Sequence, residues 1–138
     1  MTPDDTRLEK IIPKRQAALV VERDPANCEL ATERLRRLGY QVVVCPDPAA
    51  AIDWCITSGH RFELLLIGID WPTFDSVEAI AQLRTHPLTQ AMPILVVSSL
   101  SLAELQNLGH VTEYLRKPYS RRELEAALNQ ARRPRVGT

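Results

Sequence analysis

The side chains of this chain that could do chemistry come directly after short apolar runs. Glu22, Ser98 and Lys117 each lie at or just beyond the end of such a run, and Asp70 lies two residues past the run that ends at Gly68. Parallel strands place their carboxyl ends at one edge of a sheet, where sites form beside the reversal in strand order. That edge is therefore where we expect the functional site.

Several other chemistries lack the residues that they need. The three cysteines have no CxxC or metal-like spacing, and the three histidines share no ligand spacing. We interpret the cysteines as buried, reduced thiols and the histidines as surface residues. Residues 22–27 are not a glycine-rich phosphate loop, and no nucleophile–base–acid set is present. An enzyme or a nucleotide binder that relies on such residues therefore has no support in the sequence.

Five apolar runs alternate with segments of helical length. The runs are short, continuous and rich in β-branched residues, which is typical of strands covered on both faces of a parallel sheet. The alternation implies right-handed crossovers and a doubly wound sheet with helices on both faces. The expected strands are residues 17–21, 42–45, 64–68, 94–98 and 114–115.

Each expected helix has a start signal. Asp24 and Asp47 each precede a proline, which places an N-cap acceptor before a proline at the first helical position. Asp75, Ser101 and Ser120 each have a glutamate three residues further on, and the two serines match the capping box. Five helices therefore have five predicted N-caps.

Apolar stripes support the same helices. Gly39 is the expected C-cap of the first helix. In the third helix Val77, Ile80 and Ala81 form the expected stripe, which Arg84 continues. The stripes of the first and last helices consist of Cys28, Ala31, Leu35 and Leu38, and of Leu124, Ala127, Leu128 and Ala131.

Length and composition limit the remaining classes of protein. A chain of 138 residues, 45% hydrophobic and 25% charged, is typical of a single globular domain. Seventeen basic residues balance seventeen acidic ones, so no net charge draws it to nucleic acid or to an anionic membrane. No apolar run could span a bilayer or serve as a signal peptide, and we expect a cytoplasmic protein. We expect an extension or linker at residues 1–16, one domain at 17–132 and a flexible tail at 133–138.

The strand ends together spell a pattern that resembles the receiver domain of two-component response regulators. The most specific piece is the Tyr-x-x-Lys-Pro-aromatic run from Tyr114 to Tyr119, in register with the Ser98 strand end and the loop at Pro72. The resemblance covers about residues 17–132. It implies a flavodoxin-like (βα)5 three-layer sandwich with a five-stranded parallel sheet in the order 2-1-3-4-5. It also implies phosphorelay signalling in a bacterial two-component system.

The resemblance implies a role for each residue of the site. An active receiver has a phosphoacceptor aspartate at the end of its third strand and two acidic residues after its first strand that hold Mg²⁺. A hydroxyl, a lysine and a switch aromatic complete the pocket. Ser98, Lys117 and Tyr114 match these three positions, and the bond between Lys117 and Pro118 matches the family's cis peptide.

Other positions depart from the family's pattern. Glu22 matches the first acidic position with a longer side chain, Arg23 replaces the second acid and Gly68 replaces the phosphoacceptor. With Lys117 these positions carry one net positive charge, and Asp70 brings the sum only to zero. We therefore expect no Mg²⁺ site and no cofactor, with Glu22 or Asp70 as the new partner of Lys117. Arg23 either places its guanidinium where the metal would sit or points into solvent.

The leading hypothesis is a pseudo-receiver, not an enzyme, that acts as a phosphorylation-independent protein–protein interaction module. Its partner would be a histidine kinase, a regulator or a second copy, and not nucleic acid or a membrane. In the family, the docking face consists of the fourth helix, the fifth strand and the fifth helix. Charges of both signs on this face would either set partner choice or form a plain solvated surface. On that face lie Glu104, Glu113, Arg116, Arg121, Arg122 and Glu125.

The alternative hypothesis is a working receiver that uses Asp70 as acceptor for a phosphoryl group from a histidine kinase. Asp70 lies in the loop, two residues past the acceptor position. Its side chain would have to turn back by several ångströms, and in-line attack is sensitive to about 1 Å of misplacement.

Overall fold

The computed structural model describes residues 16–58, 61–70, 74–101, 103–105 and 113–132. The predicted tail and all but residue 16 of the predicted extension lie outside these ranges, as do His60 and His110. Most of the fourth expected helix also lies outside them. None of the helices in the described ranges is long and apolar enough to cross a membrane.

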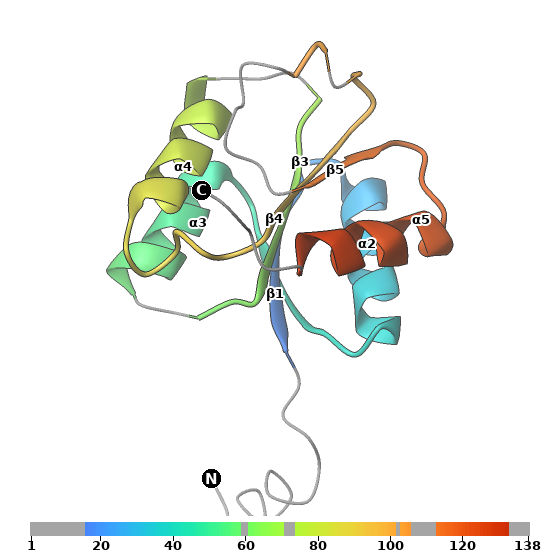
Figure 1. Ribbon diagram of the computed structural model, residues 1–138, viewed down its shortest axis with the longest axis horizontal. Coiled ribbons are helices and arrows are strands. Elements are labelled where there is room, and N and C mark those ends of the chain that lie inside the picture. Colours follow the sequence, from blue (N-terminus) through green and yellow to red (C-terminus); the bar gives the residue numbers. More distant parts are fainter. Residues whose placement is uncertain (1–15, 59–60, 71–73, 102, 106–112, 133–138) are drawn as a thin grey trace, which may run out of the picture.

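The core of the fold is a five-stranded parallel sheet in the order β2-β1-β3-β4-β5 (Figure 1). This order confirms the predicted doubly wound topology, since consecutive parallel strands need crossovers between them. The observed β2 begins one residue before the expected range, and β5 extends one residue beyond it at each end. The strands are β1 (Ala17–Val21), β2 (Gln41–Cys45), β3 (Leu64–Gly68), β4 (Ile94–Ser98) and β5 (Glu113–Arg116).

Helices cover both faces of the sheet and complete three layers (Figure 1). One face packs against α2 (Pro25–Arg37) and α5 (Arg121–Ala131). The other packs against α3 (Pro48–Ile52), the π-helical turn η1 (Asp53–Thr57) that continues it, and α4 (Phe74–Thr85).

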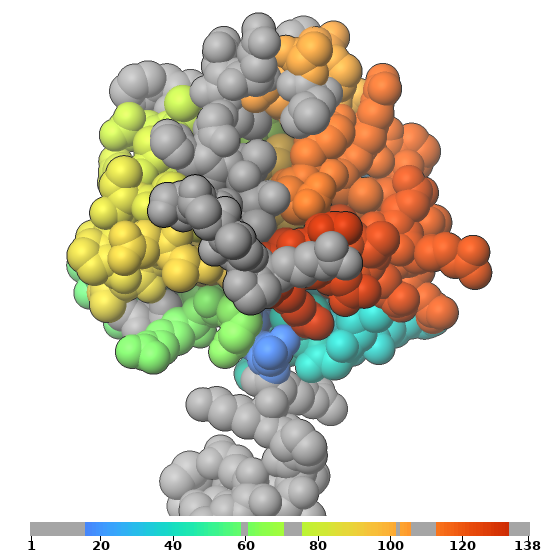
Figure 2. Space-filling view, in the orientation of Figure 1, coloured from blue at the N-terminus to red at the C-terminus, as the bar shows by residue number. Residues whose placement is uncertain are grey.

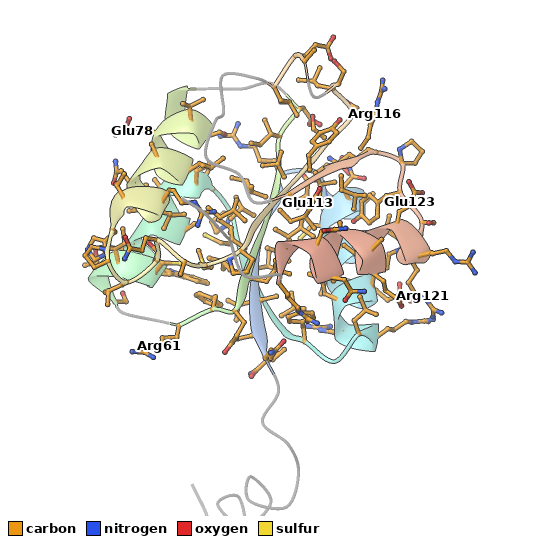
Figure 3. All side chains as sticks on the ribbon, viewed as in Figure 1. Arg61, Glu78, Glu113, Arg116, Arg121 and Glu123 are labelled. Atoms are coloured by element: carbon orange, nitrogen blue, oxygen red, sulfur yellow. The ribbon has the colours of Figure 1, made fainter. Side chains whose placement is uncertain are left out.

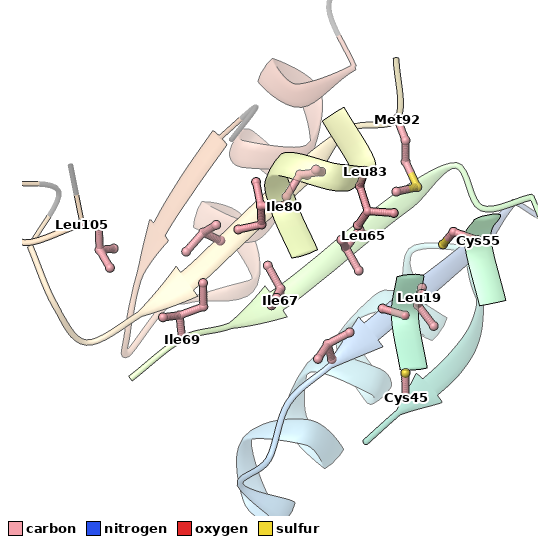
Figure 4. Close-up of a cluster of buried hydrophobic side chains, with 14 residues drawn as sticks. Leu19, Cys45, Cys55, Leu65, Ile67, Ile69, Ile80, Leu83, Met92 and Leu105 are labelled. Atoms are coloured by element: carbon pink, nitrogen blue, oxygen red, sulfur yellow. The ribbon is translucent and has the colours of Figure 1, made fainter. Parts of the chain in front are cut away.

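Alternate residues of the central strands serve the two layers of the core. Leu19, Leu65 and Ile67 belong to the cluster under α3 and α4 (Figure 4), while Val20 and Leu66 belong to the cluster under α2 and α5. Side chains alternate along a strand, so a continuous apolar run supplies both faces at once. The buried strands thereby hold their polar carboxyl ends at a fixed edge.

The predicted N-caps are observed on three of the helices. The Asp24 side chain accepts the backbone N–H of Asn27 at 2.8 Å, and the Asp47 side chain accepts that of Ala50 at 2.8 Å. Ser120 forms both bonds of a capping box at the start of α5. Such bonds satisfy backbone donors that a helix start leaves open.

The other two predicted starts have different outcomes. The paired bonds between Ser101 and Glu104 are present, but the described residues there form a turn at 103–105. The helix α4 begins at Phe74, so Asp75 lies inside it and is not its N-cap. The prediction for Asp75 was therefore wrong by at least one residue.

The apolar stripes of α2 and α5 are confirmed, and that of α4 is confirmed in part. In α2 the central stripe residues Ala31 and Leu35 are buried, and Gly39 follows the helix with a φ of 97°. All four predicted residues of α5 are buried. In α4 the buried apolar residues are Ala79, Ile80 and Leu83, while Val77 and Ala81 are only partly buried. Ile80 is therefore buried as predicted and Val77 packs against the core, while Ala79 and Leu83 are buried in addition, because packing against the sheet selects among several apolar positions.

Arg84 and the cysteines also refine the sequence expectations. Arg84 does not extend the buried stripe of α4, because its Nη1 donates to the carbonyl oxygens of Gln90 at 2.7 Å and Met92 at 2.9 Å. All three cysteines are free thiols. Cys45 and Cys55 are buried as expected, but Cys28 is only half-buried because it lies at the edge of the α2 stripe.

Candidate functional site

The strand register brings the predicted site residues to one edge of the sheet. Val21 lies opposite Ile67, Gly68 opposite Val97 and Ser98 opposite Arg116. The residues that follow each of these positions therefore emerge side by side. Segments that are far apart in the sequence meet here because parallel strands all point the same way.

Lys117 forms the central contact of the site. Its Nζ lies 2.8 Å from Oε1 of Glu22 and 3.6 Å from Oδ1 of Asp70. The Glu22 and Lys117 side chains are 4% and 12% exposed, whereas the Asp70 side chain is 65% exposed. Charge-assisted bonds of this length are among the stronger hydrogen bonds in proteins. The expectation that Glu22 or Asp70 would pair with Lys117 is confirmed, with Glu22 as the buried, short-range partner.

Glu22 is held from a second direction. Its Oε2 accepts the backbone N–H of Asp24 at 3.3 Å, at the N-cap of α2. Glu22 is one of few buried polar residues in the described part of the chain, at 8% exposure. Both oxygens of the carboxylate therefore have a donor, which a buried carboxylate needs to offset its lost hydration.

Gly68 faces the carboxylate of Glu22. A Cβ added at Gly68 would lie 2.8 Å from Oε2 of Glu22 and closer still to its Oε1 and Cδ. Nonbonded carbon atoms pack at about 3.5–4.0 Å. The Glu22 carboxylate thus fills the space that a side chain at position 68 would enter.

Ser98 and Tyr114 both bond to the backbone of Leu100. Ser98 is fully buried, and its Oγ accepts the Leu100 N–H at 3.1 Å. The Tyr114 hydroxyl donates to the Leu100 carbonyl oxygen. The loop after β4 therefore links the residues that match the family's hydroxyl and switch aromatic, a link that their spacing in the sequence could not indicate.

The segment after β5 is fastened to the end of β4. The backbone N–H of Lys117 donates to the Ser98 carbonyl oxygen at 2.8 Å, and the bond between Lys117 and Pro118 is cis, as predicted. Arg23 is exposed and forms no ion pair with any residue that the structure describes. Of its two interpretations, the structure therefore supports a side chain in solvent.

Arg34 supports the segment that carries Lys117, a role that the sequence did not reveal. Its guanidinium carbon lies 5.1 Å from the centroid of the Tyr119 ring, and its Nη1 donates to the Tyr119 carbonyl oxygen. Burial raises the pKa of the Tyr119 hydroxyl, and the nearby positive charge of Arg34 acts in the opposite direction. These contacts tie α2 to the turn that carries Lys117. An arginine near a helix end is usually solvated, so no pattern marked it.

The residues predicted for an interaction face lie within the described part of the chain. Figure 2 shows β5 and α5 as a continuous part of one side of the molecule, and Figure 3 places Arg116, Arg121 and Glu123 there. Within α5, Arg121 Nε lies 3.7 Å from Glu125 Oε1, with both side chains well exposed. Arg116, Arg122 and Glu104 are also exposed, while Glu113 is half-buried.

The described residues contain no group of three or more histidine, cysteine, aspartate or glutamate side chains that could hold a metal ion. At the strand edge, the carboxylates of Glu22 and Asp70 both approach the ammonium group of Lys117. The local arrangement is therefore an ion-pair cluster centred on Lys117.

Comparisons with known proteins agree with the fold and with the strand-end pattern. The family model for the response regulator receiver domain matches residues 18–129. The transcriptional activator protein PfeR of Pseudomonas aeruginosa is 33% identical over 112 residues, covering 78% of this chain and 35% of PfeR. The two-component response regulator-like protein APRR9 of Arabidopsis thaliana is 28% identical over 121 residues, covering 85% of this chain and 26% of APRR9. The chain thus spans about a third and a quarter of these curated relatives.

A solved structure shows the same architecture. It is the receiver domain of the sensor histidine kinase PA1611 from Pseudomonas aeruginosa, with a magnesium ion coordinated in its active site cleft. The match has a TM-score of 0.73 and 26% identity, and it covers 85% of this chain and 97% of that one. From its fold, its strand-end residues and these matches, the chain belongs to the response regulator receiver domain family.

Proposed function

We propose that this chain is a pseudo-receiver, which acts as a protein–protein interaction module without being phosphorylated. As a receiver domain it is a signalling module of two-component systems. The observation that carries the proposal is the Glu22 carboxylate, which fills the space in front of Gly68 and pairs with Lys117 at 2.8 Å. The group that would accept a phosphoryl group is replaced by a buried ion pair.

The chemistry of phosphoryl transfer supports this proposal. A carboxylate acceptor must reach the phosphorus in line while cations neutralise the transferring oxygens. Gly68 offers no oxygen. The Glu22 side chain is 4% exposed, and both its oxygens accept hydrogen bonds. Neither residue can present a free nucleophile to a phosphodonor, so we do not assign this chain an enzymatic activity.

The residues present do not fit Mg²⁺. This ion favours octahedral oxygen ligands and is usually held by carboxylates together with water. Here the Lys117 Nζ lies 2.8 Å from Oε1 of Glu22, an oxygen that a metal would need as a ligand, and 3.6 Å from Oδ1 of Asp70. Arg23 supplies a cation where the family has an acid, and Gly68 supplies no ligand. We propose that the site binds neither Mg²⁺ nor another cofactor.

The proposed module acts through its surface. Receiver domains interact with signalling proteins such as histidine kinases. We assign the docking role to the face formed by β5 and α5, where exposed Arg121 and Arg122 are followed by exposed Glu123 and Glu125 at the start of α5. Charged groups of both signs favour a partner with the complementary pattern and reject others. A histidine kinase, another regulator and a second copy are the partners that this face would serve.

One observation favours a second candidate function. The Asp70 carboxylate is 65% exposed and lies 3.6 Å from Lys117, so it is the accessible acid nearest to the family lysine. A receiver phosphorylated on Asp70 would use that proximity. Against it, Asp70 lies beyond the end of β3 and is held in no fixed geometry by a second described partner.

Incubation with a small phosphodonor and Mg²⁺, followed by intact-mass measurement, separates the two functions. We expect no adduct on the wild-type chain. A stoichiometric phosphate adduct that disappears in Asp70→Ala, but persists in a control such as Asp53→Ala at another exposed aspartate, would establish the second function. An adduct that survives Asp70→Ala would place the acceptor elsewhere and equally overturn the first.

Titration with Mg²⁺ and beryllofluoride, followed by NMR, tests the pocket without covalent chemistry. We expect no saturable shifts at Gly68 or Lys117. Sedimentation velocity tests the role of the docking face for self-association. Any dimer should be unaffected by phosphodonor and weakened by Arg121→Glu with Arg122→Glu. A dimer that forms only after phosphodonor treatment would contradict a phosphorylation-independent module.

A further inference from the structure

Gly68 is an unusual residue to find at its position. It is the last residue of β3, in the middle of the sheet, and it pairs with Val97 of β4. Glycine inside a strand costs stability and marks places where another group approaches closely. The approaching group here is the carboxylate of Glu22, from the neighbouring strand β1.

Backbone conformation does not explain the glycine. Among the described residues only Gly39 has a positive φ, so the backbone at Gly68 is one that other residues adopt. An added Cβ would meet the carboxylate at the far end of the Glu22 side chain at 2.8 Å or less, so the carboxylate would have to move to admit it. The absent side chain at position 68 and the placement of Glu22 therefore depend on each other.

We infer that Gly68 and Glu22 form one coupled unit, in which the Glu22 carboxylate takes the space and the Lys117 contact of the side chain that position 68 lacks. This inference rests on the proposed function and gives its physical basis. The site keeps one carboxylate and one ammonium, but the carboxylate comes from the end of β1 instead of β3. Lys117 then stays paired with Glu22 whether or not a phosphorelay is active.

The unit predicts that one substitution has opposite effects in two backgrounds. Gly68→Ala displaces Glu22 from Lys117 in the wild-type chain, and we expect the folding equilibrium constant to fall about tenfold, as for a lost charged hydrogen bond. In a Glu22→Ala background the space is empty. There Gly68→Ala should raise the constant about two- to fivefold, because it restricts the unfolded chain.

Urea unfolding tests this prediction on four chains, which are the wild type, Gly68→Ala, Glu22→Ala and the double variant. Gly39→Ala is the matched control, because its added Cβ meets nothing within 4 Å and its φ of 97° makes it costly in both backgrounds. A reversal of sign at Gly68, with none at Gly39, supports the unit. The same sign and size at Gly68 in both backgrounds would overturn it.

A carboxylate transposition gives a second readout if Gly68→Ala does not fold. Gly68→Asp alone should be strongly destabilised, because two carboxylates would compete for one space. Combined with Glu22→Ala, the same substitution should recover most of the lost stability, since it returns an acid to Lys117. A Gly68→Asp chain as stable as wild type would refute the inference. These stability measurements use no phosphodonor, so they are independent of the phosphorylation test. A phosphate adduct on Asp70 of the wild-type chain would contradict the proposed function without changing the stability results.

Discussion

The ion pair between Glu22 and Lys117 makes a prediction about stability. Glu22→Gln removes the negative charge and keeps the side-chain shape, while Lys117→Met removes the ammonium and keeps an aliphatic stem. The two groups lie 2.8 Å apart with exposures of 4% and 12%, so water screens them weakly. A double-mutant cycle of these variants isolates their interaction from the other contacts of each side chain.

The structure limits the size of the coupling. Hydrogen bonds to charged groups contribute about 1.5–3 kcal/mol, and removal of one partner from a fully buried pair costs about 3–5 kcal/mol. Asp70 lies 3.6 Å from Lys117 and takes up part of the charge that Glu22→Gln leaves behind. We expect a coupling of about 2 kcal/mol. Lys117→Met should cost more than Glu22→Gln, because the buried carboxylate then has no cation.

Urea unfolding at neutral pH measures this coupling. With a slope of about 1–3 kcal/mol per molar urea, 2 kcal/mol corresponds to a shift of the midpoint of about 1 M. The surface pair Arg121–Glu125 is the control, with side chains 63% and 46% exposed and a predicted coupling of about 0.3 kcal/mol. If the two cycles gave equal couplings, the strand-end pair would be a solvated surface pair and our account of the site would fail.

Three further predictions concern other elements. Ser120→Ala should lower the free energy of unfolding by about 1 kcal/mol in urea melts, because the capping box of α5 is lost. Arg34→Met should lower the free energy of unfolding by about 1–2 kcal/mol, since the contacts with Tyr119 disappear. An unchanged urea midpoint would show that these contacts do not hold α2 to the turn that carries Lys117. Burial raises the pKa of Cys55 from 9.0 to about 11. Between these values the folded chain keeps a proton that the unfolded chain loses, so stability should fall by up to about 1.4 kcal/mol per pH unit. Cys55→Ala should reduce that slope and Cys28→Ala should keep it, because burial also raises the pKa values of Cys45 and Tyr119, which add to the slope in both variants.

Local signals account for most of the fold. Each strand lies within a residue of its expected range, because short, β-branched-rich apolar runs bounded by polar residues are typical of strands covered on both faces. The caps at Asp24, Asp47 and Ser120 formed as predicted, because a capping bond joins residues three apart and needs no distant partner.

The errors arose where packing chooses among equivalent local options. The stripe of α4 was assigned to Val77, Ile80 and Ala81, but the residues that the structure buries are Ala79, Ile80 and Leu83. Both patterns have helical spacing, and the angle at which α4 meets the sheet decides between them. Arg34 carried no signal, because its partner Tyr119 is 85 residues away and meets it only through the packing of α2 against the segment after β5.

At the site, the sequence by itself determined that the third strand ends in a glycine, that an arginine follows Glu22 and that a lysine precedes the proline after the fifth strand. By the family resemblance, we propose that these residues remove the acceptor and leave a cation without its usual partner. Only the tertiary structure decided how the vacated space is used. Glu22 and Lys117 are 95 residues apart, and the strand register brings them together beside Gly68. An unpaired buried ammonium on Lys117 would be costly. The Glu22 side chain, which is longer than an aspartate, reaches Lys117 and fills the space beside Gly68.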